Sequence, residues 1–92
     1  MPRVACFAAA GIELWFNSND HRPPHFHVEK PGRWQITVRF LREASEMIVV
    51  VWGEGPTASE RKVLVRLVEP RRLELLAEWE RKVNARDPGP EQ

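Results

Sequence analysis

Apolar and polar residues alternate along the first half of this 92-residue chain, and a period of two predicts short β-strands with one side facing a core. The clearest case runs from Trp34 to Phe40, where every second residue is a large apolar one. The first two expected strands form a hairpin around Ala10-Gly11. Strands are expected at about residues 3–9, 12–17, 25–30, 34–40 and 47–52.

The last of these segments, Met47 to Trp52, departs from the alternation, because it is a continuous and mostly β-branched apolar run. Such a run is typical of a strand that is covered on both of its faces. We therefore expect this strand to be buried, or nearly so.

The period changes to that of a helix after Gly53-Glu54-Gly55-Pro56. Thr57 and Glu60 have the spacing of a capping box, in which each side chain satisfies a free amide at the start of a helix. Pro70 ends this helix or kinks it into a second one. The apolar stripes of the two expected helices consist of Val63, Leu64, Leu67 and Val68, then Leu75, Leu76, Trp79 and Val83.

Strands followed by helices predict an α+β fold: a twisted antiparallel sheet of about four or five strands, with two C-terminal helices packed on one face. Residues 1–84 are expected to form a single domain and residues 85–92 a flexible tail. The expected core consists of Phe26, Val28, Ile36, Val38, Phe40, Leu64, Leu67, Leu76 and Trp79. The other face of the sheet should carry Glu13, Trp15, His25, His27, Glu29, Gln35, Thr37 and Arg39.

Composition limits the classes of function. The 14 basic and 13 acidic residues nearly cancel, which disfavours tight binding to duplex DNA through many phosphates. One cysteine, Cys6, excludes an internal disulfide and fits a reducing compartment, and no apolar run approaches the roughly 18 residues of a membrane span. We expect a cytoplasmic protein without a membrane partner, and a chain of this size would gain stability as a homodimer.

The candidate chemistry is concentrated in one stretch, because His21, His25 and His27 all lie between Asn17 and Val28. On a strand, His25 and His27 share one face at roughly 7 Å. Their imidazoles could hold a divalent metal such as zinc, nickel or iron, with His21, Asp20 or Glu29 as a third ligand.

Two interpretations need no metal. In the first, His25 and His27 act as general base and general acid on a phosphodiester that Arg39 or Arg22 holds, because imidazole titrates near neutral pH. In the second, the histidines only fix a junction between loop and strand, or line an interface with a partner. Pro23-Pro24 stiffens this loop in either case.

Three segments resemble a small bacterial family, catalogued as domain of unknown function 4160. They are Met1-Pro2-Arg3-Val4, the stretch Asn17 to Val28 with its Pro-Pro-His-Phe-His-Val core, and Leu67-Val68-Glu69…Leu75-Leu76…Trp79. The motif positions that carry over are Asp20, His21, Pro23, Pro24, His25 and His27.

The resemblance implies one half of a two-gene cassette with a toxin–antitoxin-like role, in which a neighbouring gene encodes a second small protein. No agreed activity comes with it. The expected function is therefore an interaction module. The alternative is a small ribonuclease or metal-dependent hydrolase that uses the His25/His27 face, with RNA as its partner.

Overall fold

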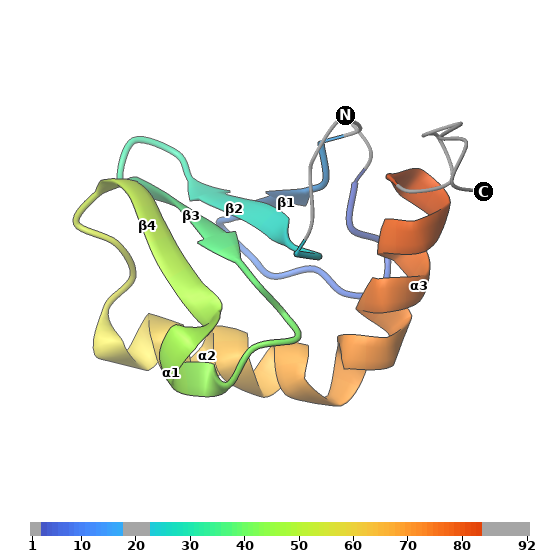
Figure 1. Ribbon diagram of the computed structural model, residues 1–92. Helices are drawn as coiled ribbons and strands as arrows, with labels where there is room; N and C mark the ends of the chain where they lie inside the picture. Colours follow the sequence, from blue (N-terminus) through green and yellow to red (C-terminus); the bar gives the residue numbers. More distant parts are fainter. Residues whose placement is uncertain (1–2, 18–22, 84–92) are drawn as a thin grey trace.

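The computed structural model describes residues 3–17 and 23–83, and within them four strands form one antiparallel sheet in the order β1-β2-β3-β4 (Figure 1). The elements are β1 Glu13–Trp15, β2 Phe26–Lys30, β3 Trp34–Val38, α1 Ala44–Met47, β4 Ile48–Gly53, α2 Ala58–Val68, the 3₁₀ helix η1 Glu69–Arg71 and α3 Arg72–Lys82. The predicted α+β fold is confirmed, with α1 as an additional short helix. The predicted tail, 85–92, lies outside the described residues, and the domain boundary at residue 84 stays a prediction.

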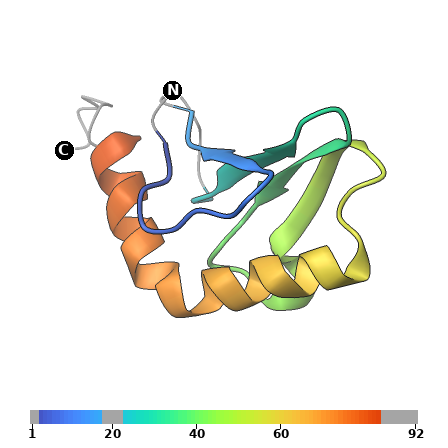
Figure 2. The same ribbon diagram turned by 180° about the vertical axis from the view of Figure 1, so that it is seen from behind.

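The first predicted strand, residues 3–9, is wrong. This segment contributes only an isolated bridge between Arg3 and Trp15 and a 3.3 Å hydrogen bond from the Val4 amide to the Leu14 carbonyl. Val4 and Phe7 are both buried, although a strand would point side chains three positions apart to opposite faces. The segment is instead an irregular chain, which lies on the near side of the sheet in Figure 2 and adds both side chains to the core.

The helices enclose one side of the sheet. α2 runs beneath the sheet. After η1 the chain turns upward, and α3 stands beside one end of the strands in both views (Figures 1 and 2). Pro70 lies in η1, so the predicted interruption of the helix is confirmed. The predicted capping box is present as well: the Thr57 hydroxyl accepts from the Glu60 amide, and the Glu60 carboxylate accepts from the Thr57 amide.

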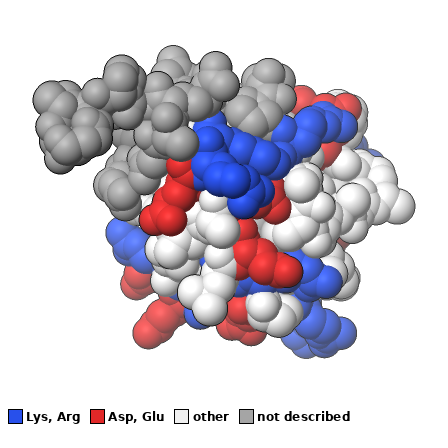
Figure 3. All heavy atoms as spheres, turned by 90° about the vertical axis from the view of Figure 1, so that its right-hand side faces the viewer, with Lys and Arg blue, Asp and Glu red and all other residues white. Residues whose placement is uncertain are grey.

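The face of the molecule on the α3 side carries acidic and basic side chains interspersed with uncharged ones (Figure 3). Several of these charges pair along a helix, such as Lys82 with Glu78 at 3.0 Å. The face therefore presents no field of a single sign. No helix in the described part of the chain is long and apolar enough to cross a membrane.

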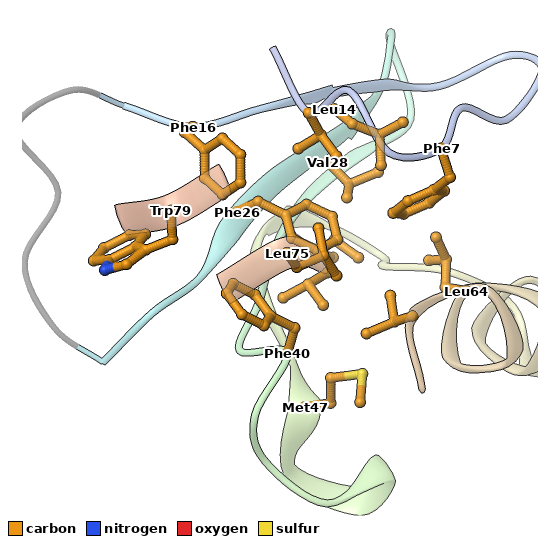
Figure 4. Close-up of a cluster of buried hydrophobic side chains, with 14 of the residues drawn as sticks. Phe7, Leu14, Phe16, Phe26, Val28, Phe40, Met47, Leu64, Leu75 and Trp79 are labelled. Carbon is orange, nitrogen blue, oxygen red and sulfur yellow. The ribbon is translucent and has the colours of Figure 1, made fainter. Parts of the chain in front are cut away.

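The core lies between the sheet and the two long helices (Figure 4). In it the rings of Phe26 and Phe40 stack with their centroids 6.1 Å apart, and the ring of Phe16 meets that of Trp79 edge-on at a centroid distance of 6.4 Å. The predicted strand register is confirmed, because Phe26 points into this core. Of the predicted core residues, Phe26, Val28, Ile36, Val38, Phe40, Leu64 and Trp79 are buried, while Leu67 and Leu76 pack against the core and are partly buried. Leu75, rather than Leu76, is the fully buried leucine of α3.

The prediction that the strand from Met47 to Trp52 is buried is wrong. Met47 ends α1 and is fully buried, but β4 is the last strand of the sheet and its residues from Val49 onward are exposed. A bulge between Gln35 and Ile36 leaves Val51 without a partner residue on β3. The apolar run is therefore an edge strand that the described residues do not cover.

Candidate functional site

His25 and His27 lie in an aromatic cluster with Trp15 from β1 and Trp79 from α3. We call Trp15, Asn17, His25, His27 and Trp79 the histidine cluster. β1 positions Trp15 directly opposite His27, and the two rings stack with their centroids 5.5 Å apart. Trp15 is thus on the predicted face of the sheet, and it is buried there, with 8% of the residue accessible.

His25 precedes β2 and is half-buried. Its ring meets the His27 ring edge-on at 5.1 Å and tilts toward Trp79 at 5.4 Å. The Nδ1 atom lies 2.7 Å from the carbonyl oxygen of Pro23, so Nδ1 carries a proton and donates it. In the neutral ring this leaves the lone pair on Nε2, the atom that would act as a base or a metal ligand.

His27 is held more tightly, with 9% of the residue accessible. Its Nε2 lies 3.2 Å from Nδ2 of Asn17, and an amide nitrogen can only donate. The lone pair of Nε2 therefore accepts from Asn17 in this arrangement. A metal ion at this nitrogen would have to displace the Asn17 amide.

The proposed metal site is only partly within the described residues. His25 and His27 lie together, whereas His21 and Asp20 lie outside the described ranges. No group of three potential ligands from His, Cys, Asp and Glu forms among the residues that are described. The set His21, His25 and His27 stays a prediction.

Arg39 reaches the same face as the two histidines. The register pairs Phe26 with Val38, and its continuation by one residue places Arg39 opposite His25. Arg39 directly follows β3 and is half-buried, and its amide donates to the Met47 carbonyl at 2.8 Å. A cation and two imidazoles on one face could bind an anionic group. Arg22 lies outside the described residues.

A second candidate surface lies on β4, the strand that the sequence predicts to be buried and the structure leaves exposed. We call Val49, Val50, Val51 and Trp52 the β4 edge; their accessible fractions are 40%, 42%, 54% and 41%. Trp52 is thus an exposed tryptophan, and its Nε1 donates to Oε1 of Gln35 at 3.3 Å. The local signal was the absence of any charged residue from Met47 to Trp52, since edge strands usually carry such residues to prevent pairing.

The buried carboxylate of Glu78 ties the N-terminal segment to α3. It accepts from the Ala5 amide at 2.8 Å and from the Lys82 ammonium at 3.0 Å. Burial alone would raise the pKa of Glu78, but these donors and the Cys6 thiol together hold the pKa below its usual range. Burial, and then the Glu78 carboxylate beside it, raise the pKa of Cys6 to about 11. Cys6 is therefore a structural thiol and a poor nucleophile.

Comparison with known proteins gives one match. The model of a family described as "Domain of unknown function (DUF4160)" matches residues 11–80. The matched range spans the sheet and α2 and most of α3, including both described histidines. No curated protein and no solved structure matches the chain.

Proposed function

Because this chain belongs to the family described as Domain of unknown function (DUF4160), we propose that it is a cytoplasmic interaction module of a two-gene, toxin–antitoxin-like cassette. Its partner in this proposal is the small protein encoded by the neighbouring gene. The observation that carries the proposal is the exposed β4 edge.

The β4 edge has two properties of a binding surface. Its outer side offers backbone amides and carbonyls that no described strand pairs, and such a row of groups is a template for another strand. Its side chains are apolar on both faces of the sheet, with Leu41 also 46% exposed nearby in the chain. Clustered exposed apolar residues usually mark an interaction site.

The histidine cluster has a supporting role in this proposal. Stacking of His27 on Trp15, and the bond from His25 to the Pro23 carbonyl, fix the loop end against the sheet. Of the two histidines, His25 retains enough exposure to touch a partner. Its replacement should weaken a complex less than a charge placed on the β4 edge.

A specific observation favours the alternative, a ribonuclease. The His25 and His27 rings are 5.1 Å apart, and Arg39 follows on the same face. Two imidazoles at this separation can act on one phosphodiester, one as base and one as acid, with the guanidinium holding the phosphate. This mechanism requires His27 to release Asn17 or to use its other nitrogen.

The experiment that tests the module is co-expression with the neighbouring gene product, followed by purification through a tag on the partner. We expect wild type and Leu73→Lys to co-purify, since Leu73 is 81% exposed on α3. Val49→Lys and Val51→Lys should lower the recovered fraction at least about tenfold, because a charge would be buried in the interface. Equal recovery of all four proteins would contradict the proposal.

The same proteins test the enzyme. Wild type, His25→Ala and His27→Ala are incubated with RNA, with and without a chelator. The module predicts no cleavage by any of them. Acid–base catalysis predicts a bell-shaped pH profile and a loss of roughly 10²–10⁴-fold in rate for either variant. Metal analysis of untagged protein completes the test, because a real site requires near-stoichiometric metal that either histidine variant abolishes.

A further inference from the structure

A cleft of about 690 Å³ lies between α1 and α2. α1 contributes Ala44 and Ser45 to its wall, and α2 contributes Arg61, Lys62 and Arg66. One acidic residue, Glu69, also lines it, but Glu69 approaches Arg72 at 3.9 Å. The cleft is therefore basic in net charge.

The three cations of the cleft have no acidic partner within the described ranges, where the ion pairs join Lys30 to Glu60, Arg42 to Glu46, Arg72 to Glu69 and Lys82 to Glu78. Lys62 and Arg66 are exposed, and Arg61 is half-buried. Three unpaired cations around a cleft attract an anionic group. The molecule as a whole has a net charge of only +1, so the concentration of charge is local.

The cleft adjoins the β4 edge through the chain itself. α1 ends at Met47 and β4 begins at Ile48, so the helix that contributes Ala44 and Ser45 to the cleft leads directly into the edge strand (Figure 1). A strand that paired with β4 and continued past Ile48 would run alongside α1. At about 3.3 Å per residue, a few further residues would reach the cations of α2.

We propose that the β4 edge and this cleft together bind one extended segment of a partner protein, apolar where it pairs with β4 and acidic where it reaches the cleft. The inference rests on the proposed interaction module and specifies the chemistry of its partner. Backbone pairing with β4 would supply affinity, and the cations would select the acidic end and fix the register.

A second copy of this chain fits the surface less well. Antiparallel pairing of two β4 strands places the start of one beside the end of the other. Glu46 precedes β4 and Glu54 follows it, so acidic residues of the two copies would meet at both ends. RNA would match the cations but would leave the valines of the edge uncovered.

Two synthetic peptides test the proposal. Both contain three Thr-Val repeats, the length of β4, and one ends in three aspartates while the other ends in three lysines. Each carries a fluorophore, and binding is measured by fluorescence anisotropy with the full chain. We expect the acidic peptide to bind at least about tenfold more tightly, with an affinity that falls as salt is raised.

Charge reversal provides the decisive variant. Arg61→Glu/Arg66→Glu should reverse the preference, so that the lysine peptide binds more tightly than the aspartate peptide. Arg33→Glu/Arg81→Glu, two exposed arginines outside the cleft, serves as the matched control and should leave the preference unchanged. Val51→Lys should weaken both peptides. Circular dichroism and thermal unfolding establish that each variant is folded.

Equal affinity for the two peptides, no binding of either, or a preference that survives the charge reversal would overturn the inference. So would a dimer by analytical ultracentrifugation that Val51→Lys dissociates, because the edge would then bind a second copy. A different result would contradict the proposed interaction module: co-purification of the neighbour-encoded protein with the β4 variants as well as with the wild type. If the β4 variants lose the partner but the two peptides bind equally well, the interaction module stands and only the acidic segment is ruled out.

Discussion

At the scale of single residues, Glu78 shows how a carboxylate can be stabilised where only 4% of its residue is accessible. The Ala5 amide and the Lys82 ammonium both donate to Oε1, and Lys82 also donates to the Arg3 carbonyl at 2.8 Å. An irregular segment that lacks a strand ladder is thus attached to α3 through charge-assisted hydrogen bonds. Because Cys6 lies in that segment, the carboxylate also adds to the effect of burial in raising the pKa of the Cys6 thiol.

The first prediction concerns the effect of the Glu78 carboxylate on the Cys6 thiol. Glu78→Gln removes the negative charge beside the thiol, so the pKa of Cys6 should fall from about 11 and the native protein should react faster with iodoacetamide at pH 8. We expect a several-fold rise in rate, measured by mass spectrometry. Glu80→Gln, an exposed neighbour on α3, is the control and should leave the rate unchanged. Unfolded wild type should react faster than either.

The second prediction follows from linkage between pKa and stability. The pKa of Cys6 is raised from 9.0 to about 11 in the folded protein, so the unfolded chain loses its thiol proton first. The contribution of the Cys6 thiol to the free energy of unfolding is fully present below pH 9 and decreases as pH rises toward 11. The free energy of unfolding, measured in urea, should therefore fall more steeply over this pH range for the wild type than for Cys6→Ala. Parallel curves would show that the thiol is not linked to folding.

The opposite linkage applies to Glu78. Its pKa is lowered in the folded state, so its contribution is present above the usual carboxyl pKa and decreases as pH falls below it. At neutral pH, Glu78→Ala should cost about 2–3 kcal/mol in free energy of unfolding, because buried donors lose a charged acceptor. Glu80→Ala should cost less than about 0.5 kcal/mol. Similar losses for the two variants would mean that the buried contacts contribute little.

The residues of the histidine cluster show what a local pattern can and cannot predict. Alternation around Phe26 correctly assigns it to the core. It does not predict that Trp15 is buried, because that depends on which residue the neighbouring strand places beside it. Trp15 lies opposite His27 only through the register of β1 with β2, and their stacked rings shield each other. Register depends on contacts distant in sequence.

At the scale of elements, the turn that ends β4 depends on a glycine. Gly53 has φ +83°, a left-handed conformation, and a Cβ there would lie 2.8 Å from the Cα of Trp34 and closer still to the Arg33 carbonyl oxygen. Gly32, in the turn between β2 and β3, has φ +76°, with no atom within 4 Å of such a Cβ. The two glycines share the conformational requirement and differ in the space around them.

This pair of glycines defines the fourth prediction. Gly32→Ala should cost about 1–2 kcal/mol, the penalty of a left-handed conformation for a residue with a side chain. Gly53→Ala should cost roughly 1–3 kcal/mol more, because the backbone of β3 must also move. Urea unfolding measures both values. Equal costs would show that the end of β4 shifts freely away from β3.

The capping box and the edge strand mark the limits of prediction for elements. Thr57 and Glu60 were identified because both halves of the box lie within four residues, and their bonds depend on little else. The burial of β4 was predicted wrongly for the opposite reason. A continuous apolar run indicates a strand, but whether a further strand pairs beyond it depends on the order of the sheet, and β4 is the last of four.

At the scale of the whole molecule, the sheet has one face covered by helices and one apolar edge that the described residues leave open. Such an edge favours aggregation unless a partner covers it. A small chain also buries a limited share of its surface, so a partner adds stability that its own core does not supply. The proposed module thus explains why an unprotected apolar strand is tolerated: in the complex, it would be an internal strand.

The last prediction tests this explanation in the isolated protein. Val51→Lys places a charge on the open edge and should raise the concentration at which the protein aggregates on mild heating, measured by light scattering. Val63→Lys is the matched control, since Val63 is 51% exposed on α2 and Val51 is 54% exposed on β4. Both exposed substitutions should change the free energy of unfolding by less than about 0.5 kcal/mol. Only the β4 variant should suppress aggregation, because strands associate through unpaired backbone groups and helices lack them. If Val63→Lys suppresses aggregation as well, general hydrophobicity rather than the β4 edge drives association, and the main physical reason for a partner at this strand is lost.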